Sequence, residues 1–87
     1  ESALAEVQEA LAGGRFDHGW KHLHILVRDT PAFGEKALEL LAHHTGGSDA
    51  LRLQVSGDAL MASGRYWDAL ARYSDALAAV RQQRLAR

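Results

Sequence analysis

The sequence has no cysteine, one proline and no long apolar run. Without cysteine the chain has no disulfide framework, no thiolate nucleophile and no cysteine-based zinc site. Residues 23–27 are interrupted by His24, and the longest uninterrupted apolar stretch, residues 76–80, has five members, whereas a helix needs about 20 apolar residues to cross a membrane. We therefore expect no membrane-spanning helix and no membrane partner, and the start of the sequence lacks the basic and apolar segments of a signal peptide.

An excess of either charge is also absent. The sequence has 10 Lys and Arg residues against 11 Asp and Glu residues, for a formal net charge of −1, so we expect no nucleic-acid partner. With 87 residues, 47% of them hydrophobic and 24% charged, the composition is that of one folded domain. We expect this domain to be soluble, with the cytoplasm slightly favoured, and we interpret it as a piece of a longer protein.

Apolar residues recur at intervals of three and four, and no stretch alternates with a period of two. This periodicity predicts an all-α fold. Glycine-containing turns and Pro31 divide the sequence into five expected helices, at residues 2–12, 15–28, 32–44, 48–62 and 65–86. The residues expected to cap or end these helices are Ser2, Gly13, Gly14, Thr30, Gly46, Gly47 and Ser48.

The last expected helix, residues 65–86, has the clearest apolar stripe. The members of this stripe are Tyr66, Ala69, Leu70, Tyr73, Ala76, Leu77 and Val80. Trp67 lies off the stripe, and two interpretations are open: it packs against the end of the preceding helix, or it is an exposed anchor for a partner, since tryptophan is enriched at binding hot spots. Asp68 and Arg72, four residues apart, are expected to form an ion pair on the helix surface.

A short segment occurs twice, fifty positions apart. Residues 12–16 read Ala-Gly-Gly-Arg-Phe and residues 62–66 read Ala-Ser-Gly-Arg-Tyr, each time between two expected amphipathic helices. An internal repeat of this kind indicates that similar helix pairs stack on one another in an array.

Around its second copy, over residues 50–83, the sequence resembles the tetratricopeptide repeat family. The matching residues are Gly57, Leu60, Gly64, Tyr66, Ala69, Leu70, Tyr73, Ala76 and Leu77. Residues 1–33 are similar to the same repeat through Gly14, Phe16, Leu23, Leu26 and Pro31. The resemblance implies a right-handed superhelical stack of about five antiparallel helices, each packed on the one before and the one after. Within this single domain, residues 1–87, we expect a repeat at 1–33, an extra helix at 34–47, a repeat at 48–83 and a basic tail at 81–87.

The same resemblance implies a function, because the concave face of tetratricopeptide repeats usually holds a peptide. The residues that would line this face are Leu4, Gln8, Leu11, Gln54, Asp58 and Met61. Gln8 and Asp58 stand where the carboxylate clamp of heat-shock co-chaperones has asparagine, so an apolar or mildly basic peptide is expected. The chain would then be a non-catalytic protein-interaction module, a scaffold or chaperone-like adaptor in a larger bacterial protein or assembly. Residues 1–44 are also similar to the helical tail of thioredoxin-like bacterial co-chaperones.

A self-associating structural domain is an alternative hypothesis. The two ends of the sequence differ in charge, with Glu1, Glu6 and Glu9 early and Arg81, Arg84 and Arg87 late. This asymmetry either complements the helix dipoles or provides an edge for association between copies of the chain.

A histidine-based metal-binding bundle is a further hypothesis. His18 and His22, four residues apart, have a spacing that helical zinc ligands use, although solvated or interhelical histidines are the plainer interpretation and no cofactor is expected. His24 is expected to border the core. No serine lies in a nucleophile motif, and the glycine pairs lack the lysine of a phosphate-binding loop, so we expect no catalytic residues and no enzymatic activity.

Overall fold

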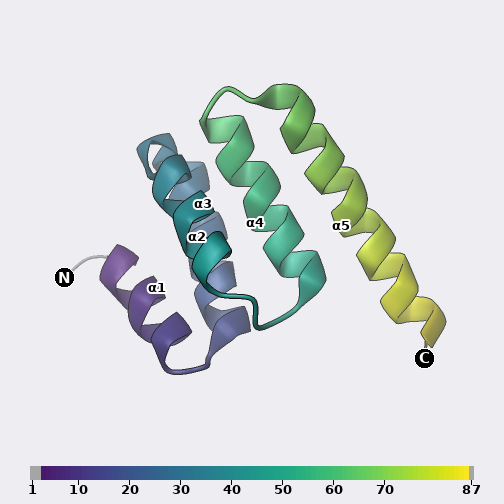
Figure 1. Ribbon diagram of the computed structural model, residues 1–87, viewed down its shortest axis with the longest axis horizontal. Coiled ribbons are helices and arrows are strands. Elements are labelled where there is room, and N and C mark those ends of the chain that lie inside the picture. The colour runs from purple at the N-terminus through teal and green to yellow at the C-terminus, as the bar shows by residue number, and fades with distance from the viewer. Residues whose placement is uncertain (1–2, 87) are drawn as a thin grey trace.

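A computed structural model of the chain describes residues 3–86, with side chains described as far as residue 85. Its elements are α1 (Ala3–Ala12), α2 (Phe16–Asp29), the single 3₁₀ turn η1 (Pro31–Phe33), α3 (Gly34–His43), α4 (Asp49–Ala62) and α5 (Tyr66–Ala86) (Figure 1). No strand occurs within residues 3–86. The predicted all-α fold with five helices is confirmed.

Two of the connections are tight antiparallel hairpins with the same geometry. Between α1 and α2, the Arg15 amide donates to the Ala10 carbonyl (2.8 Å) and the Gly14 amide to that of Leu11 (3.2 Å). Between α4 and α5, Arg65 donates to Leu60 (2.9 Å) and Gly64 to Met61 (3.1 Å). Both patterns are Schellman motifs, and their glycines have φ values of 81° and 80°. The repeat found in the sequence is therefore a repeat of structure at these two turns.

The middle of the chain is arranged differently from a simple stack. Helix α2 packs mainly on α1 and α4, whereas α3 packs mainly on α4 and touches α2 only slightly. The expectation that each helix packs on the one before and the one after is therefore wrong for α2 and α3. The reason lies at Gly34, where an added Cβ would be 2.9 Å from the Ala59 carbonyl and 3.1 Å from Ala62 Cβ, so the start of α3 lies directly against α4.

Helix ends follow the expected chemistry at some positions and not at others. The Ser48 side chain caps α4 by accepting from the Leu51 amide (3.3 Å), as predicted. The Thr30 side chain makes no capping hydrogen bond before Pro31, so that expectation is wrong. The cap expected at Ser2 lies outside the described residues.

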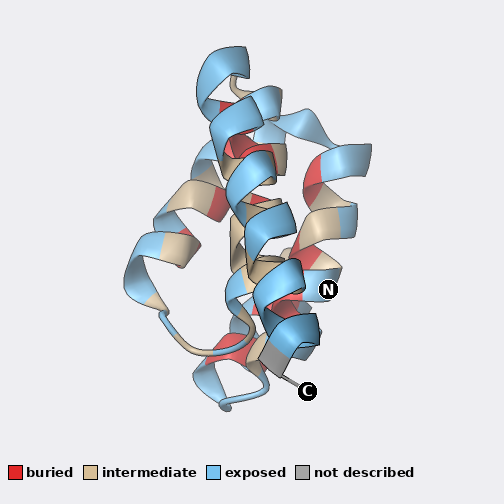
Figure 2. Cartoon of the chain, turned by 90° about the vertical axis from the view of Figure 1, so that its right-hand side faces the viewer, coloured by how far each residue is buried: buried red, intermediate tan, exposed pale blue. Residues whose placement is uncertain are grey.

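The core is built by the first four helices. Its buried members are Val7, Leu11, Trp20, Leu23, Val27, Ala37, Leu40, Val55 and Ala59. Within the described side chains, α5 has one buried residue, Ala69. Figure 2, viewed from the side of α5, shows most of that helix as exposed. Helix α5 therefore contributes little to the buried core, although it packs extensively along α4.

Trp20 ties α2 to the α3–α4 connection. Its Nε1 donates to the Gly46 carbonyl (2.9 Å), and the Arg52 guanidinium lies 5.9 Å from its ring centroid. Arg52 Nη2 also donates to the carbonyls of Leu41 and His44, both at 3.2 Å. The arginine therefore satisfies carbonyls at the C-terminal end of α3, where a cation also complements the helix dipole.

Candidate functional site

The most exposed apolar surface lies on α5. Tyr66, Leu70 and Leu77 are 60%, 53% and 63% exposed, whereas Ala69 is fully buried against the rest of the domain. Together with the half-buried Tyr73, these three side chains fall within one side of the helix at 100° per residue. We call Tyr66, Leu70, Tyr73 and Leu77 the α5 face.

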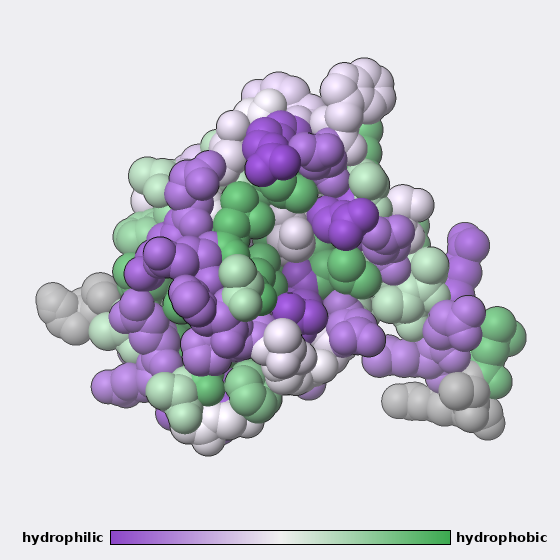
Figure 3. All heavy atoms as spheres, viewed as in Figure 1, coloured by the Kyte–Doolittle hydropathy of each residue, from purple (hydrophilic) through white to green (hydrophobic). Residues whose placement is uncertain are grey.

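A groove between α4 and α5 borders the α5 face. It has a volume of about 370 Å³ and is lined by Ala50, Leu51, Gln54, Tyr73, Ala76, Leu77 and Val80. Apart from the Tyr73 hydroxyl, the amide of Gln54 is the one polar side-chain group in this lining. The α4–α5 groove therefore suits apolar side chains of a ligand. Figure 3 shows hydrophobic residues interspersed with hydrophilic ones over the face of the molecule that Figure 1 presents.

A second groove lies on the other side of Tyr73, between α2, η1 and α4. It has a volume of about 450 Å³ and is lined by Val27, Arg28, Pro31, Asp58, Met61, Ala62 and Tyr73. Tyr73 therefore separates two grooves that follow the same side of α4. The ring lies directly on the α4 backbone, since a Cβ added at Gly57 would be 2.6 Å from Tyr73 Cε1.

Asp58 links three helices at this point. Its Oδ2 pairs with Nδ1 of His24 on α2, and its Oδ1 accepts a hydrogen bond from the Tyr73 hydroxyl on α5. Burial, followed by the hydrogen bond and the negative charge of Asp58, raises the pKa of Tyr73 above its ordinary value. The phenol therefore remains a neutral donor. His24 borders the core as expected, but its pairing with Asp58 was not predicted.

The residues expected to line one concave face are only partly brought together. Gln54, Asp58 and Met61 lie along α4 at the two grooves, although the Asp58 carboxylate already has two internal partners. Of the described elements α1 packs on α2 alone, so its expected residues are remote from those of α4.

On α1 itself, the three expected residues have different environments. Leu11 is 2% exposed and belongs to the core, so its assignment to a binding surface is wrong. Leu4 is partly buried against the same core. Gln8 is exposed. A continuous peptide groove through both hairpins is therefore absent from the described part of the chain.

Trp67 does not pack against the end of α4. Its side chain is 84% exposed at the start of α5, where it directly follows Tyr66 in the sequence. Of the two interpretations open from the sequence, the structure contradicts the packed one.

The charged side chains of α5 pair differently from the sequence-based expectation. Asp68 pairs with Arg65 at 2.9 Å and Arg72 pairs with Asp75 at 2.8 Å, so the expected ion pair between Asp68 and Arg72 is wrong. Arg81 and Arg84 are exposed and have no ion pair within the described residues. The third member of the expected edge, Arg87, lies outside those residues.

The two histidines considered as metal ligands are close together. The ring centroids of His18 and His22 are 4.4 Å apart and the rings are inclined by 51°. Across residues 3–86, no group of three or more His, Asp or Glu side chains is arranged around a common point. The pair can contribute at most two ligands of the four that a structural zinc site has.

Comparison with known proteins adds no relative: no protein-family model, no curated protein and no solved structure matches the chain. Among the described helices, none is both long enough and apolar enough to cross a membrane.

Proposed function

We propose that this chain is a non-catalytic protein-binding module that holds its partner at the α5 face and the adjoining α4–α5 groove. The observation that carries the proposal is the exposure of Leu70 and Leu77, at 53% and 63%, beside a groove with largely apolar walls. Contiguous apolar patches on a soluble domain commonly mark interaction sites.

The family resemblance is part of the same proposal. The two hairpins with matching Schellman turns at Gly14 and Gly64 support repeats of the tetratricopeptide type at residues 1–33 and 48–83, with 34–47 as an inserted helix. In this proposal the helices form a right-handed superhelical stack, and the chain acts as a scaffold or adaptor within a larger assembly. Its partners are proteins or peptides, and it has no enzymatic activity.

Trp67 supports a binding role at the same end of α5. A tryptophan that is 84% exposed makes no contribution to the core, and burial of a large aromatic ring is a frequent source of binding free energy. We assign it to the rim of the site, next to Tyr66.

The proposal is tested by selecting peptides against the immobilised chain from two displayed libraries, one helical and one extended. We expect selected ligands to bind the Leu77→Glu variant at least about tenfold more weakly, because a charge would enter the apolar contact. Ile25→Glu is the matched control, since Ile25 is 47% exposed on α2 and lines neither groove. Ligands that bind the Leu77→Glu variant as well as the unmodified chain would contradict the proposed site.

A further inference from the structure

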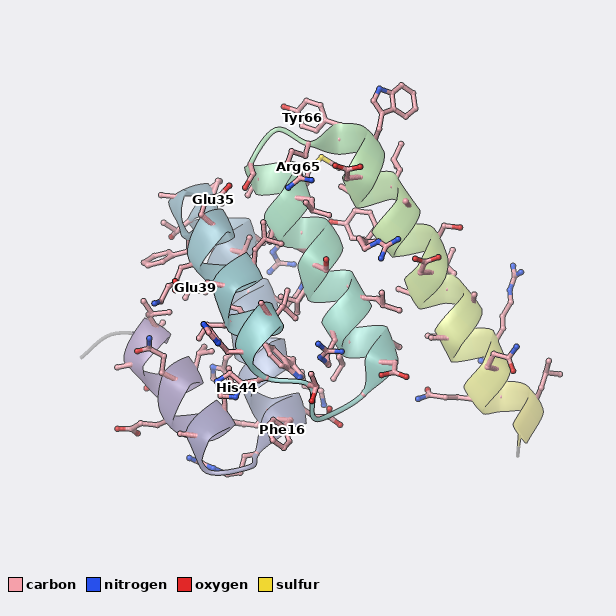
Figure 4. All side chains as sticks on the ribbon, viewed as in Figure 1. Phe16, Glu35, Glu39, His44, Arg65 and Tyr66 are labelled. Atoms are coloured by element: carbon pink, nitrogen blue, oxygen red, sulfur yellow. The ribbon has the colours of Figure 1, made fainter. Side chains whose placement is uncertain are left out.

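The first hairpin shows how an equivalent of the α5 face is covered. At a shift of fifty positions, Phe16, Trp20, Leu23 and Val27 of α2 correspond to Tyr66, Leu70, Tyr73 and Leu77 of α5. Trp20 and Val27 are 0% and 1% exposed, whereas Leu70 and Leu77 are 53% and 63% exposed. Figure 4 shows the labelled pair: Phe16 lies at the start of α2 and Tyr66 at the start of α5. The same surface is thus buried on α2 and uncovered on α5.

Helix α4 covers much of the surface of α2 and runs parallel to α2. Near the start of both helices, Arg52 lies over the Trp20 ring, and Asp17 accepts a hydrogen bond from the Ser48 amide that precedes α4 (2.7 Å). Further along both helices, Asp58 pairs with His24. Contacts in the same order along both helices show that α4 runs in the direction of α2.

We propose that the α5 face binds an amphipathic helix of another protein, which lies parallel to α5 as α4 lies on α2. This inference rests on the proposed function and specifies its partner. The bound helix presents aliphatic side chains like Leu51 and Val55 of α4, with smaller residues like Ala59 and Ala62 toward its end; Val55 and Ala59 belong to the core cluster and the other two pack against it. The contact continues an interface that the chain already forms internally.

The length of α5 supports the parallel direction. Helix α2 ends at Asp29, whereas α5 continues past the corresponding residue, Ala79, to Ala86. This extension carries Arg81 and Arg84, and no acidic residue occurs in it. A parallel partner helix would end close to these arginines, which favour the carbonyls and acidic side chains at a helix C-terminus. Arg52 already makes this contact with the end of α3.

A second copy of the chain fits the α5 face less well. On the opposite end of the molecule, the exposed residues of α1 include Glu6, Gln8 and Glu9, which are not an apolar cover. Two α5 faces placed against each other would supply no free carboxylate for Arg81 and Arg84, because Asp68 and Asp75 already pair with arginines of their own helix. We therefore assign the surface to a helix with its own acidic C-terminal end.

The test uses a displayed library of 16-residue helical peptides built on residues 48–63 of this chain, varied at the positions equivalent to 51, 55, 58, 59 and 62. We expect binders whose dissociation constants rise at least about tenfold on Leu70→Glu or Leu77→Glu and stay unchanged on Ile25→Glu. The double change Arg81→Gln with Arg84→Gln should weaken binding about three- to tenfold, and the double change to lysine should restore it.

Photocrosslinking determines the direction of the bound helix. With p-benzoylphenylalanine at position 66 the N-terminal half of the peptide should be labelled, and with the probe at position 77 the C-terminal half should be labelled. The reverse pattern would overturn the parallel arrangement and leave the proposed function intact. Two other results would overturn the helical partner and leave the proposed function intact: only extended peptides bind in a Leu77-dependent manner, or the chain without peptide crosslinks to a second copy. Binders whose dissociation constants are unchanged by both Leu70→Glu and Leu77→Glu would contradict the inference and the proposed function together.

Discussion

The two tryptophans show how strongly the surroundings of a single residue decide its role. Trp20 is fully buried and Trp67 is 84% exposed, although both stand near the start of the second helix of a hairpin. Trp20 also donates to the Gly46 carbonyl and therefore holds the α3–α4 connection, whereas Trp67 has no contact of this kind within the described residues. The first is a structural residue and the second is available to a partner.

Substitution of each tryptophan by alanine tests this difference. Trp20→Ala should lower the free energy of unfolding by about 3–5 kcal/mol, because it leaves a large cavity in the core. Trp67→Ala should change it by less than about 0.5 kcal/mol. Urea denaturation followed by circular dichroism measures both values. A large loss for Trp67→Ala would show that this side chain belongs to the folded core.

Tyr73 gives the domain a sensitivity to alkaline pH. Burial and the carboxylate of Asp58 raise the pKa of Tyr73 above its ordinary value of 10.0, so the folded chain holds the phenolic proton more tightly than the unfolded chain does. The resulting stability is complete below about pH 10 and is lost as the pH rises through the folded pKa. We expect the free energy of unfolding to fall more steeply above about pH 10 in the unmodified chain than in Tyr73→Phe. Parallel pH profiles of the two proteins would contradict this assignment.

Single-residue contacts were the hardest features to predict from the sequence. The spacing of Asp68 and Arg72 permits an ion pair, but each side chain has an alternative partner three residues away, and those pairs form instead. The pairing of His24 with Asp58 spans thirty-four positions and depends on the direct contact of α2 with α4. No local pattern indicates such a contact.

At the scale of helices, the sequence was far more informative. Each expected helix begins and ends within two residues of the observed bounds. The reason is that a glycine or Pro31 follows the end of each of the first four helices and marks its C-terminus. The position of α3 was not predictable in this way. Its apolar periodicity requires a buried face, but the close approach of Gly34 to α4 decides which helix covers it.

The attachment of α5 to α4 depends on small residues at the contact. Ala69 is fully buried, and α4 with α5 forms the most extensive helix contact of the domain. Ala69→Glu would place a charge in this contact and should cost more than about 3 kcal/mol. Ala71→Glu is the control at an exposed position of the same helix, with an expected effect within about 0.5 kcal/mol. Equal melting temperatures for the two variants would contradict the packing of α5.

At the scale of the whole molecule, the two ends of the array are unequal. The core occupies α1 to α4, and the α5 side is covered by nothing in the described chain. Figure 1 places the two chain ends at opposite sides of the long dimension, with α1 at one side and α5 at the other. The principal extents are 40 × 30 × 20 Å. Helical arrays usually end in a polar outer face, whereas the α5 face exposes Tyr66, Leu70 and Leu77.

The solution mass shows whether the chain covers this face by itself. We expect light scattering across a tenfold concentration range to give the mass of one chain, because two opposed α5 faces offer Arg81 and Arg84 no α5 carboxylate that is free of an ion pair. Addition of a selected partner helix should then raise the mass by one peptide and protect the amides of α5 from hydrogen exchange. A discrete dimer that dissociates on Leu77→Glu would instead make the chain its own partner, through the same four side chains.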